Sequence, residues 1–365
     1  MDRVGSSRAG IDPSVDFGVY LHIPFCRVRC DYCAFATFTD RHDLRSAYLD
    51  ACRTDIERTV SRGMRTATTV FVGGGTPTQV DPEHLGRVLD AIPLADGAEV
   101  TVECNPDDVT EDLLRAYRRH RVNRVSLGVQ SMVPEVLATL GRTHQPENVS
   151  RAVEAIRAVG MSSFNLDIIY GVAGETVEQW QTTVRAALAL DPPHISAYGL
   201  TVEPGTPLAT DEARWPDDDD QADKYELADD LLAAAGLANY EVSNWARPGH
   251  ESRHNRLYWA QADYAGFGCA AHSHESGRRW WNVRTPERYI ELTAAGESPE
   301  SAGETLDAAT RRIEGLQLAL RTREGVPRGV LAEEGLEEFI EVQAERVVLT
   351  RRGRLMANEV SLRLQ

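Results

Sequence analysis

The chain has 365 residues, of which 42% are apolar, so it is long enough for one large domain and a smaller one. Its 39 lysine and arginine residues against 56 aspartate and glutamate residues give a net charge of −17. This charge repels nucleic acid and anionic membrane surfaces, so we expect no nucleic-acid partner. The first residues lack the apolar core of a secretory signal, and no apolar run is long enough to span a bilayer, which predicts a cytoplasmic protein.

The first two hundred residues alternate short apolar or β-branched runs with amphipathic stretches. Segments such as 43–60 and 147–160 carry apolar residues at helical spacing. Between the helices, six runs bounded by Gly, Pro or Asn are predicted to be strands. These strands cover residues 18–23, 68–72, 99–103, 124–129, 164–170 and 194–200. Six βα repeats predict an α/β fold with a parallel sheet, either doubly wound or curled into a barrel, with ligands at the C-terminal ends of the strands.

The pattern changes after Pro207. The acidic run DEARWPDDDDQADK is typical of a solvated connection that leads into a helix. Beyond residue 305, helical segments precede a short hairpin, which resembles a winged-helix-like α+β domain. We therefore expect an N-terminal tail at 1–17, a barrel at 18–210, a region at 211–300 that packs on the barrel, and a C-terminal domain at 301–365.

Three cysteines lie within eight positions, in CRVRCDYC, directly after the first predicted strand. In a reducing compartment, clustered cysteines are metal ligands or catalytic groups more often than disulfides. A structural zinc site normally takes four ligands from two pairs, and the sequence has no second pair at matching spacing. A [4Fe-4S] cubane on Cys26, Cys30 and Cys33 leaves one iron open for an amine and a carboxylate, which S-adenosylmethionine supplies. The other cysteines are expected to be small buried hydrophobes: Cys52, Cys104 and Cys269.

Polar and glycine-rich segments follow several of the predicted strands. FVGGGTPT, at 71–78, lacks the GK[ST] of a phosphate loop, but its glycines allow close backbone approach to a ligand. Glu103, Gln130, Arg142 and Asp167 lie at further strand ends. Taken singly, each is an ordinary barrel-rim residue.

Together these motifs carry a resemblance to a known family. CRVRCDYC, with an aromatic residue before its last cysteine, resembles the cluster loop of the radical S-adenosylmethionine superfamily. YLHIPFC, FVGGGTPT, SLGVQS, LGRTH, NLDIIYG and ISAYGLTVEPGTPLA resemble the branch that contains oxygen-independent coproporphyrinogen III oxidases and HemW-type heme chaperones. The resemblance implies a partial (β/α)6 TIM-like barrel that holds a [4Fe-4S] cluster. It places S-adenosylmethionine at Tyr20, Tyr32, Gly74, Gly75, Thr76, Glu103, Gln130, Arg142 and Asp167.

Three further features separate the two branches. The oxidase loop continues to a fourth cysteine two residues past the third, where this chain has Phe35, and the oxidase has a longer N-terminal arm. RHNRLYW, at 253–259, resembles the H-N-x-x-Y motif of the chaperones, which implies heme contact by His254, Asn255 and Tyr258. By residue type alone, a polar loop histidine with a packed tyrosine is the alternative. A metal site on His250 and His254 would need a helix, which the preceding Pro248 and Gly249 disfavour.

The favoured function is therefore a heme chaperone that binds heme, delivers it to hemoproteins, and keeps a [4Fe-4S] cluster and S-adenosylmethionine. The alternative is an oxygen-independent coproporphyrinogen III oxidase that decarboxylates two propionates through a deoxyadenosyl radical. A third possibility, a structural iron–sulfur or zinc protein, leaves the glycine run and the polar strand ends unexplained. A low-potential electron donor, peripheral membrane association through partners and a homodimer are further expectations.

Overall fold

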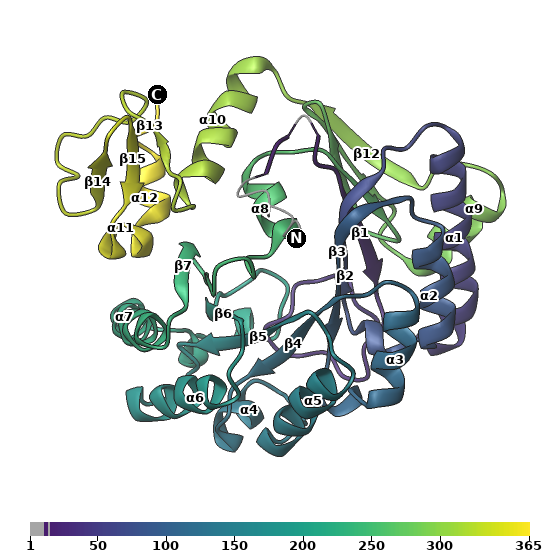
Figure 1. The fold of residues 1–365 in the computed structure, drawn as a ribbon, viewed down its shortest axis with the longest axis horizontal. Helices are drawn as coiled ribbons and strands as arrows, with labels where there is room; N and C mark the ends of the chain where they lie inside the picture. The colour runs from purple at the N-terminus through teal and green to yellow at the C-terminus, as the bar shows by residue number, and fades with distance from the viewer. Residues whose placement is uncertain (1–10, 14) are drawn as a thin grey trace, which may run out of the picture.

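The computed structural model, which describes residues 11–13 and 15–365, is built on one open twelve-stranded sheet and one small three-stranded sheet (Figure 1). Most of the predicted N-terminal tail, residues 1–10 and 14, lies outside the described residues. The predicted parallel strands are all present and are neighbours in chain order. They are β1 (Gly18–Ile23), β2 (Ala67–Gly74), β3 (Leu94–Cys104), β4 (Arg124–Gln130), β5 (Ser163–Tyr170) and β6 (His194–Gly199). The α/β fold class is confirmed.

Helices cover the outer face of these strands (Figure 1). They are α1 (Arg45–Ser61), α2 (Pro82–Asp90), α3 (Glu111–Arg119), α4 (Pro134–Thr139), α5 (Pro146–Ala158) and α6 (Val177–Ala189). Because side chains alternate along a strand, Val19, Leu21 and Ile23 are buried in the core with the helices. Tyr20 and His22 therefore point to the concave inner face, where the Tyr20 hydroxyl lies 2.9 Å from Nδ1 of His22.

The chain after β6 extends the sheet at both edges. It forms α7 (Asp218–Ala234), β7 (Ala238–Glu241), β8 (Asn244–Ala246), α8 (Arg253–Trp259), β9 (Tyr264–Phe267), β10 (His272–Glu275), β11 (Arg278–Asn282), α9 (Pro286–Ala294) and β12 (Glu300–Thr305). Strand β8 pairs with β6, β9 pairs with β1, and β7 and β12 are the two edges. The sheet is thus an open barrel, and residue 301, the expected start of the C-terminal domain, falls inside β12.

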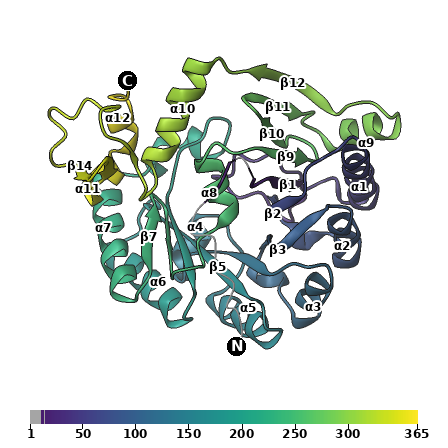
Figure 2. The same cartoon turned by 45° about the horizontal axis from the view of Figure 1, so that its top comes forward.

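The C-terminal domain packs beside α7, and its first helix crosses the open side of the barrel and joins the domain to the sheet (Figure 2). It comprises α10 (Ala308–Leu320), β13 (Val326–Pro327), β14 (Ile340–Gln343), β15 (Arg346–Leu349), α11 (Arg351–Leu355) and α12 (Ala357–Ser361). Leu320, Val326, Val347 and Val360 form its own small core. Within the described ranges, the helices are all too short or too polar to cross a membrane.

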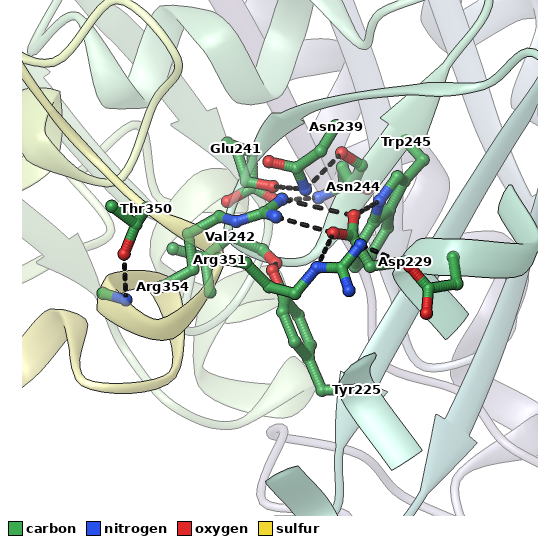
Figure 3. A network of polar contacts seen from close by, with 12 residues as sticks. Tyr225, Asp229, Asn239, Glu241, Val242, Asn244, Trp245, Thr350, Arg351 and Arg354 are labelled. Atoms are coloured by element: carbon green, nitrogen blue, oxygen red, sulfur yellow. Dashed lines mark hydrogen bonds and ion pairs between the residues drawn. The ribbon is translucent and has the colours of Figure 1, made fainter. Parts of the chain in front are cut away.

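A buried carboxylate fastens this domain to the barrel (Figure 3). Asp229 on α7 accepts a hydrogen bond from Trp245 Nε1 at 2.7 Å, and its other oxygen accepts from Arg351 Nε at 2.7 Å and Arg354 Nη2 at 2.8 Å. Burial alone would raise the pKa of Asp229, but the Trp245 hydrogen bond and the two guanidinium groups hold it below its ordinary value. The Asp229 carboxylate therefore joins α7 to α11 through charge-assisted hydrogen bonds.

Candidate functional site

A cavity of about 650 Å³ opens at the C-terminal ends of the parallel strands. Its wall includes the three cysteines of the cluster loop and eight of the nine positions predicted for S-adenosylmethionine. These eight are Tyr32, Gly74, Gly75, Thr76, Glu103, Gln130, Arg142 and Asp167. The ninth, Tyr20, is absent from the lining and lies deeper on the concave face, against His22. Tertiary folding thus brings nearly all of the predicted set into one site.

The three thiols of the cluster loop face this cavity. Cys26 is buried, whereas Cys30 and Cys33 are half-buried. Burial raises the pKa of the Cys26 and Cys33 thiols, so binding of iron there would displace their protons. Among the described residues, no three His, Cys, Asp or Glu side chains could share a single metal ion. In a cubane, each thiolate binds a different iron, so this arrangement suits a cluster.

Contacts from distant segments hold the cluster loop in place. Arg27 forms an ion pair with Asp108 at 2.8 Å, and Asp31 forms one with Arg214 at 3.0 Å. Arg142 Nη1 lies 3.7 Å from the sulfur of Cys30, and Arg142 Nη2 donates to the Gly128 carbonyl oxygen at 3.1 Å. The Thr76 hydroxyl lies 3.6 Å from the sulfur of Cys26. Two of the polar positions predicted for the cofactor therefore also touch the thiols.

The glycine run serves the packing of the protein itself. The amide of Gly75 donates to the Ile23 carbonyl oxygen, and that of Thr76 to the Phe25 carbonyl oxygen, both at 2.8 Å. A Cβ on Gly75 would lie 2.8 Å from both of these oxygens and 3.1 Å from the sulfur of Cys26. We expected the glycines to allow close approach of a ligand. The structure shows that Gly75 also allows close approach of the chain that leads into the cluster loop, because the Gly75 and Thr76 amides bind the carbonyl groups of that chain.

Two carboxyl groups, those of Glu103 and Asp167, also line the cavity. Asp167 accepts hydrogen bonds from Ser126 at 2.9 Å and from Asn165 at 2.7 Å, and Glu103 accepts from the Gly74 amide at 3.1 Å. Burial, followed by the neighbouring Asp167 carboxylate, raises the pKa of Glu103 to about 8. Glu103 is therefore protonated at neutral pH, and a cationic ligand would favour its ionised form.

Sequence reasoning missed several cavity residues. Ser126 and Gly128 precede Gln130 by four and two positions on β4, and all three line the cavity. Tyr198, 38% exposed on β6, also lines it. Strand alternation was the available signal, since residues two and four positions before a predicted site residue share its face. Gln130 itself has φ of 62°, a strained left-handed conformation at the strand end.

The motif predicted to contact heme lies elsewhere, in helix α8 at the N-terminal ends of the strands. The Glu99 carboxylate accepts from the amides of Arg253 and His254 at 3.2 Å, which fixes the start of the helix against β3. Tyr258 and Asn255 are half-buried, and the Asn255 amide donates to the capping hydroxyl of Ser252 at 3.3 Å. The segment is thus a short capped helix rather than a polar loop.

His254 is 1% exposed and both of its ring nitrogens are engaged. Nδ1 lies 2.8 Å from the Thr69 hydroxyl, Nε2 lies 2.8 Å from the Tyr258 hydroxyl, and the ring stacks on Phe71. Burial lowers the pKa of His254 to about 3, so the imidazole is neutral. His250 instead hydrogen-bonds Ser163 at 2.9 Å. The structure therefore does not bring the HNRLY motif into the cluster site, and its heme contact stays a prediction.

Comparison with known proteins identifies both a domain within this chain and the family of the whole chain. Residues 20–187 match the Radical SAM superfamily. The heme chaperone HemW of Mycobacterium tuberculosis (strain H37Rv) is 41% identical, over 95% of this chain and 94% of the relative. This chain belongs to the HemW family. HemW from Bacillus subtilis is 33% identical over 93% of this chain and 97% of its own length, and that from Escherichia coli is 35% identical over 90% and 89%.

The fold of this HemW-family chain is also that of a solved radical SAM enzyme. Coproporphyrinogen III oxidase (HemN) from Escherichia coli superimposes with a TM-score of 0.84, over 96% of this chain and 90% of the oxidase. The two sequences are 21% identical, so the likeness concerns the fold. One scaffold thus underlies both branches, and the choice between them depends on particular residues.

Proposed function

We propose that this HemW-family chain is a heme chaperone that carries a [4Fe-4S] cluster and S-adenosylmethionine in the cavity, and that delivers heme to hemoproteins. One observation carries the proposal: the cluster loop offers three thiols to a roomy cavity, and Phe35 stands where the oxidase branch has its fourth cysteine. Phe35 is 64% exposed and lines the cavity mouth. The long alignments with HemW relatives support the same choice.

The residues of the cavity fit the proposed cofactors. Cys26, Cys30 and Cys33 would hold three irons and leave the fourth for the amine and carboxylate of S-adenosylmethionine. The Glu103 and Asp167 carboxyl groups line the cavity, and a cationic cofactor would favour the ionised form of both. When bound, the cluster and S-adenosylmethionine together supply one-electron chemistry. The cluster loop and the segments at the strand ends would bind and orient them in the cavity.

The first test is metal content. Anaerobic reconstitution should give about four irons and four sulfides per chain. Cys26→Ala should abolish this content, while Cys52→Ala is the matched control, because Cys52 is equally buried but packs in the hydrophobic core. If the iron content survived Cys26→Ala but fell with Cys52→Ala, the proposed set of cluster ligands would be wrong.

The second test separates the chaperone from the oxidase. The cluster-loaded chain, given coproporphyrinogen III, S-adenosylmethionine and a reductant without oxygen, should form no protoporphyrinogen. The same preparation should bind about one heme per chain, seen as a shift of heme absorption. Turnover of coproporphyrinogen III would refute the chaperone assignment, whatever the heme spectrum showed.

A further inference from the structure

The concave face of the barrel continues onto the added strands β9, β10 and β11. Strand register pairs Gly18 of β1 with Tyr264 of β9, Tyr264 with His274 of β10, and His272 of β10 with Trp281 of β11. Residues in register share a face, and so do residues two apart on one strand. Tyr264, His272, His274 and Trp281 therefore lie on the face that carries Tyr20 into the barrel.

Aromatic contacts connect this face to the HNRLY motif. The ring of His254 lies 4.8 Å from that of Tyr258, which lies 4.7 Å from Tyr264, and Tyr264 lies 6.3 Å from His274, all between ring centroids. The motif thus supports β10 from inside the barrel. A substitution at His254 can alter β10 without any direct contact between His254 and a ligand there.

His272 is exposed on this face. Its ring stacks on Trp281, with centroids 5.6 Å apart and planes 30° from parallel. Within the described part of the chain, neither of its ring nitrogens has a hydrogen-bond partner. Partial desolvation of the ring, and then the nearby Arg279 guanidinium, lower the pKa of His272, so the imidazole is neutral and keeps a free lone pair. His254, by contrast, has both nitrogens occupied.

His274, two residues further along β10, adds an independent observation. It is 6% exposed, and its Nδ1 lies 3.2 Å from the Ala262 carbonyl oxygen. Its Nε2 is buried without a partner among the described residues. Unsatisfied buried nitrogens are rare in folded proteins and are commonly met by a ligand or a water molecule. Two imidazoles with open nitrogens thus share one face of a single strand.

The number of side chains that are free to coordinate a metal indicates which kind of ligand this face could bind. A free transition-metal ion normally takes three or four protein ligands, and no such group of side chains exists in the described residues. The iron of a porphyrin already has four macrocycle nitrogens and needs only one or two axial ligands from the protein. The indole of Trp281 stacks on the imidazole of His272 and holds that ring in one orientation, as an axial ligand requires.

We propose that His272 is an axial ligand of heme iron, with Trp281 holding the imidazole in place, and that His254 and Tyr258 act by positioning β10. This inference rests on the proposed function, because it presumes that the chain binds heme. It names a ligand outside the HNRLY motif and separate from the cysteine loop.

The test is a heme titration of the full cluster-loaded chain. His272→Gly should weaken heme binding at least tenfold and remove the absorption signature of an imidazole ligand, and free imidazole added to this variant should restore that signature. His42→Gly is the matched control, because His42 is also exposed but lies in the turn before α1, hydrogen-bonded to Arg45. The control should bind heme as the wild type does.

Tyr258→Phe distinguishes a positioning role from a direct one. It removes the hydroxyl that binds His254 and keeps the ring that packs on Tyr264, so the imidazole signature should remain. Wild-type affinity and spectrum in His272→Gly, or loss of the signature in Tyr258→Phe alone, would overturn this site and leave the chaperone function standing. Failure of the wild-type chain to bind heme would instead refute the proposed function itself, and this site with it.

Discussion

Replacing Asp229 by asparagine should loosen the C-terminal domain from the barrel. The variant keeps an oxygen that can accept from Trp245, but the two guanidinium groups of Arg351 and Arg354 lose their carboxylate. Breaking a buried ion pair typically costs about 3–5 kcal/mol. Because the Arg351 side chain is 37% exposed, we expect the lower end of that range, about 3 kcal/mol of the free energy of unfolding.

Urea unfolding, followed by tryptophan fluorescence and circular dichroism, measures this loss. The folded-state pKa of Asp229 is lowered, so its stabilisation is fully present above the unfolded value of about 3.9 and disappears as pH falls through the folded value. The difference between wild type and variant should be constant from about pH 8 to pH 5 and shrink below about pH 4.

Asp230→Asn is the matched control for this prediction. Its carboxylate is 65% exposed and pairs with the same Arg351, so its removal should cost less than about 1 kcal/mol. Equal costs for the two substitutions would refute the reasoning. So would a stability difference between wild type and Asp229→Asn that persists unchanged in acid.

Two further predictions concern the cavity. Gly75→Val should lower both iron content and S-adenosylmethionine binding, because its Cβ would lie 3.1 Å from the sulfur of Cys26. Full iron content in that variant would contradict the packing argument. S-adenosylmethionine affinity should rise with pH, by up to about tenfold per unit below pH 8, as Glu103 with its pKa of about 8 loses its proton. Glu103→Gln should flatten this part of the profile, and an unaltered slope in the variant would remove Glu103 from the binding site.

Much of the cluster site could be predicted from the sequence, because its residues follow the strands of a regular βα repeat. Glu103 and Asp167 come at or near the ends of β3 and β5, and parallel strands present their C-terminal ends at one edge. Ser126 could have been predicted from strand alternation. Tyr20 was predicted to line the cofactor site, and the structure leaves it outside the cavity wall, against His22.

The role of the glycines needed the structure. Their conformational freedom is visible in the sequence, but the atoms that approach Gly75 belong to Ile23, Phe25 and Cys26, some fifty positions away. Sequence spacing carries no information on which distant backbone comes within 3 Å. For the same reason, the four strands that extend the sheet beyond α8 were not foreseen, since they join it only through the pairing of β9 with β1, which is set by long-range register.

The sequence by itself determined the α/β class, the six parallel strands, the three-cysteine loop and the family, because these depend on local periodicity and on short motifs. Only the tertiary structure decided that HNRLY lies in a short helix whose His254 is buried with both ring nitrogens occupied, and that His272 is exposed with its nitrogens open. The physical reason is burial. Whether an imidazole is free to bind iron depends on which groups fold against it, and those groups lie on strands far apart in the chain.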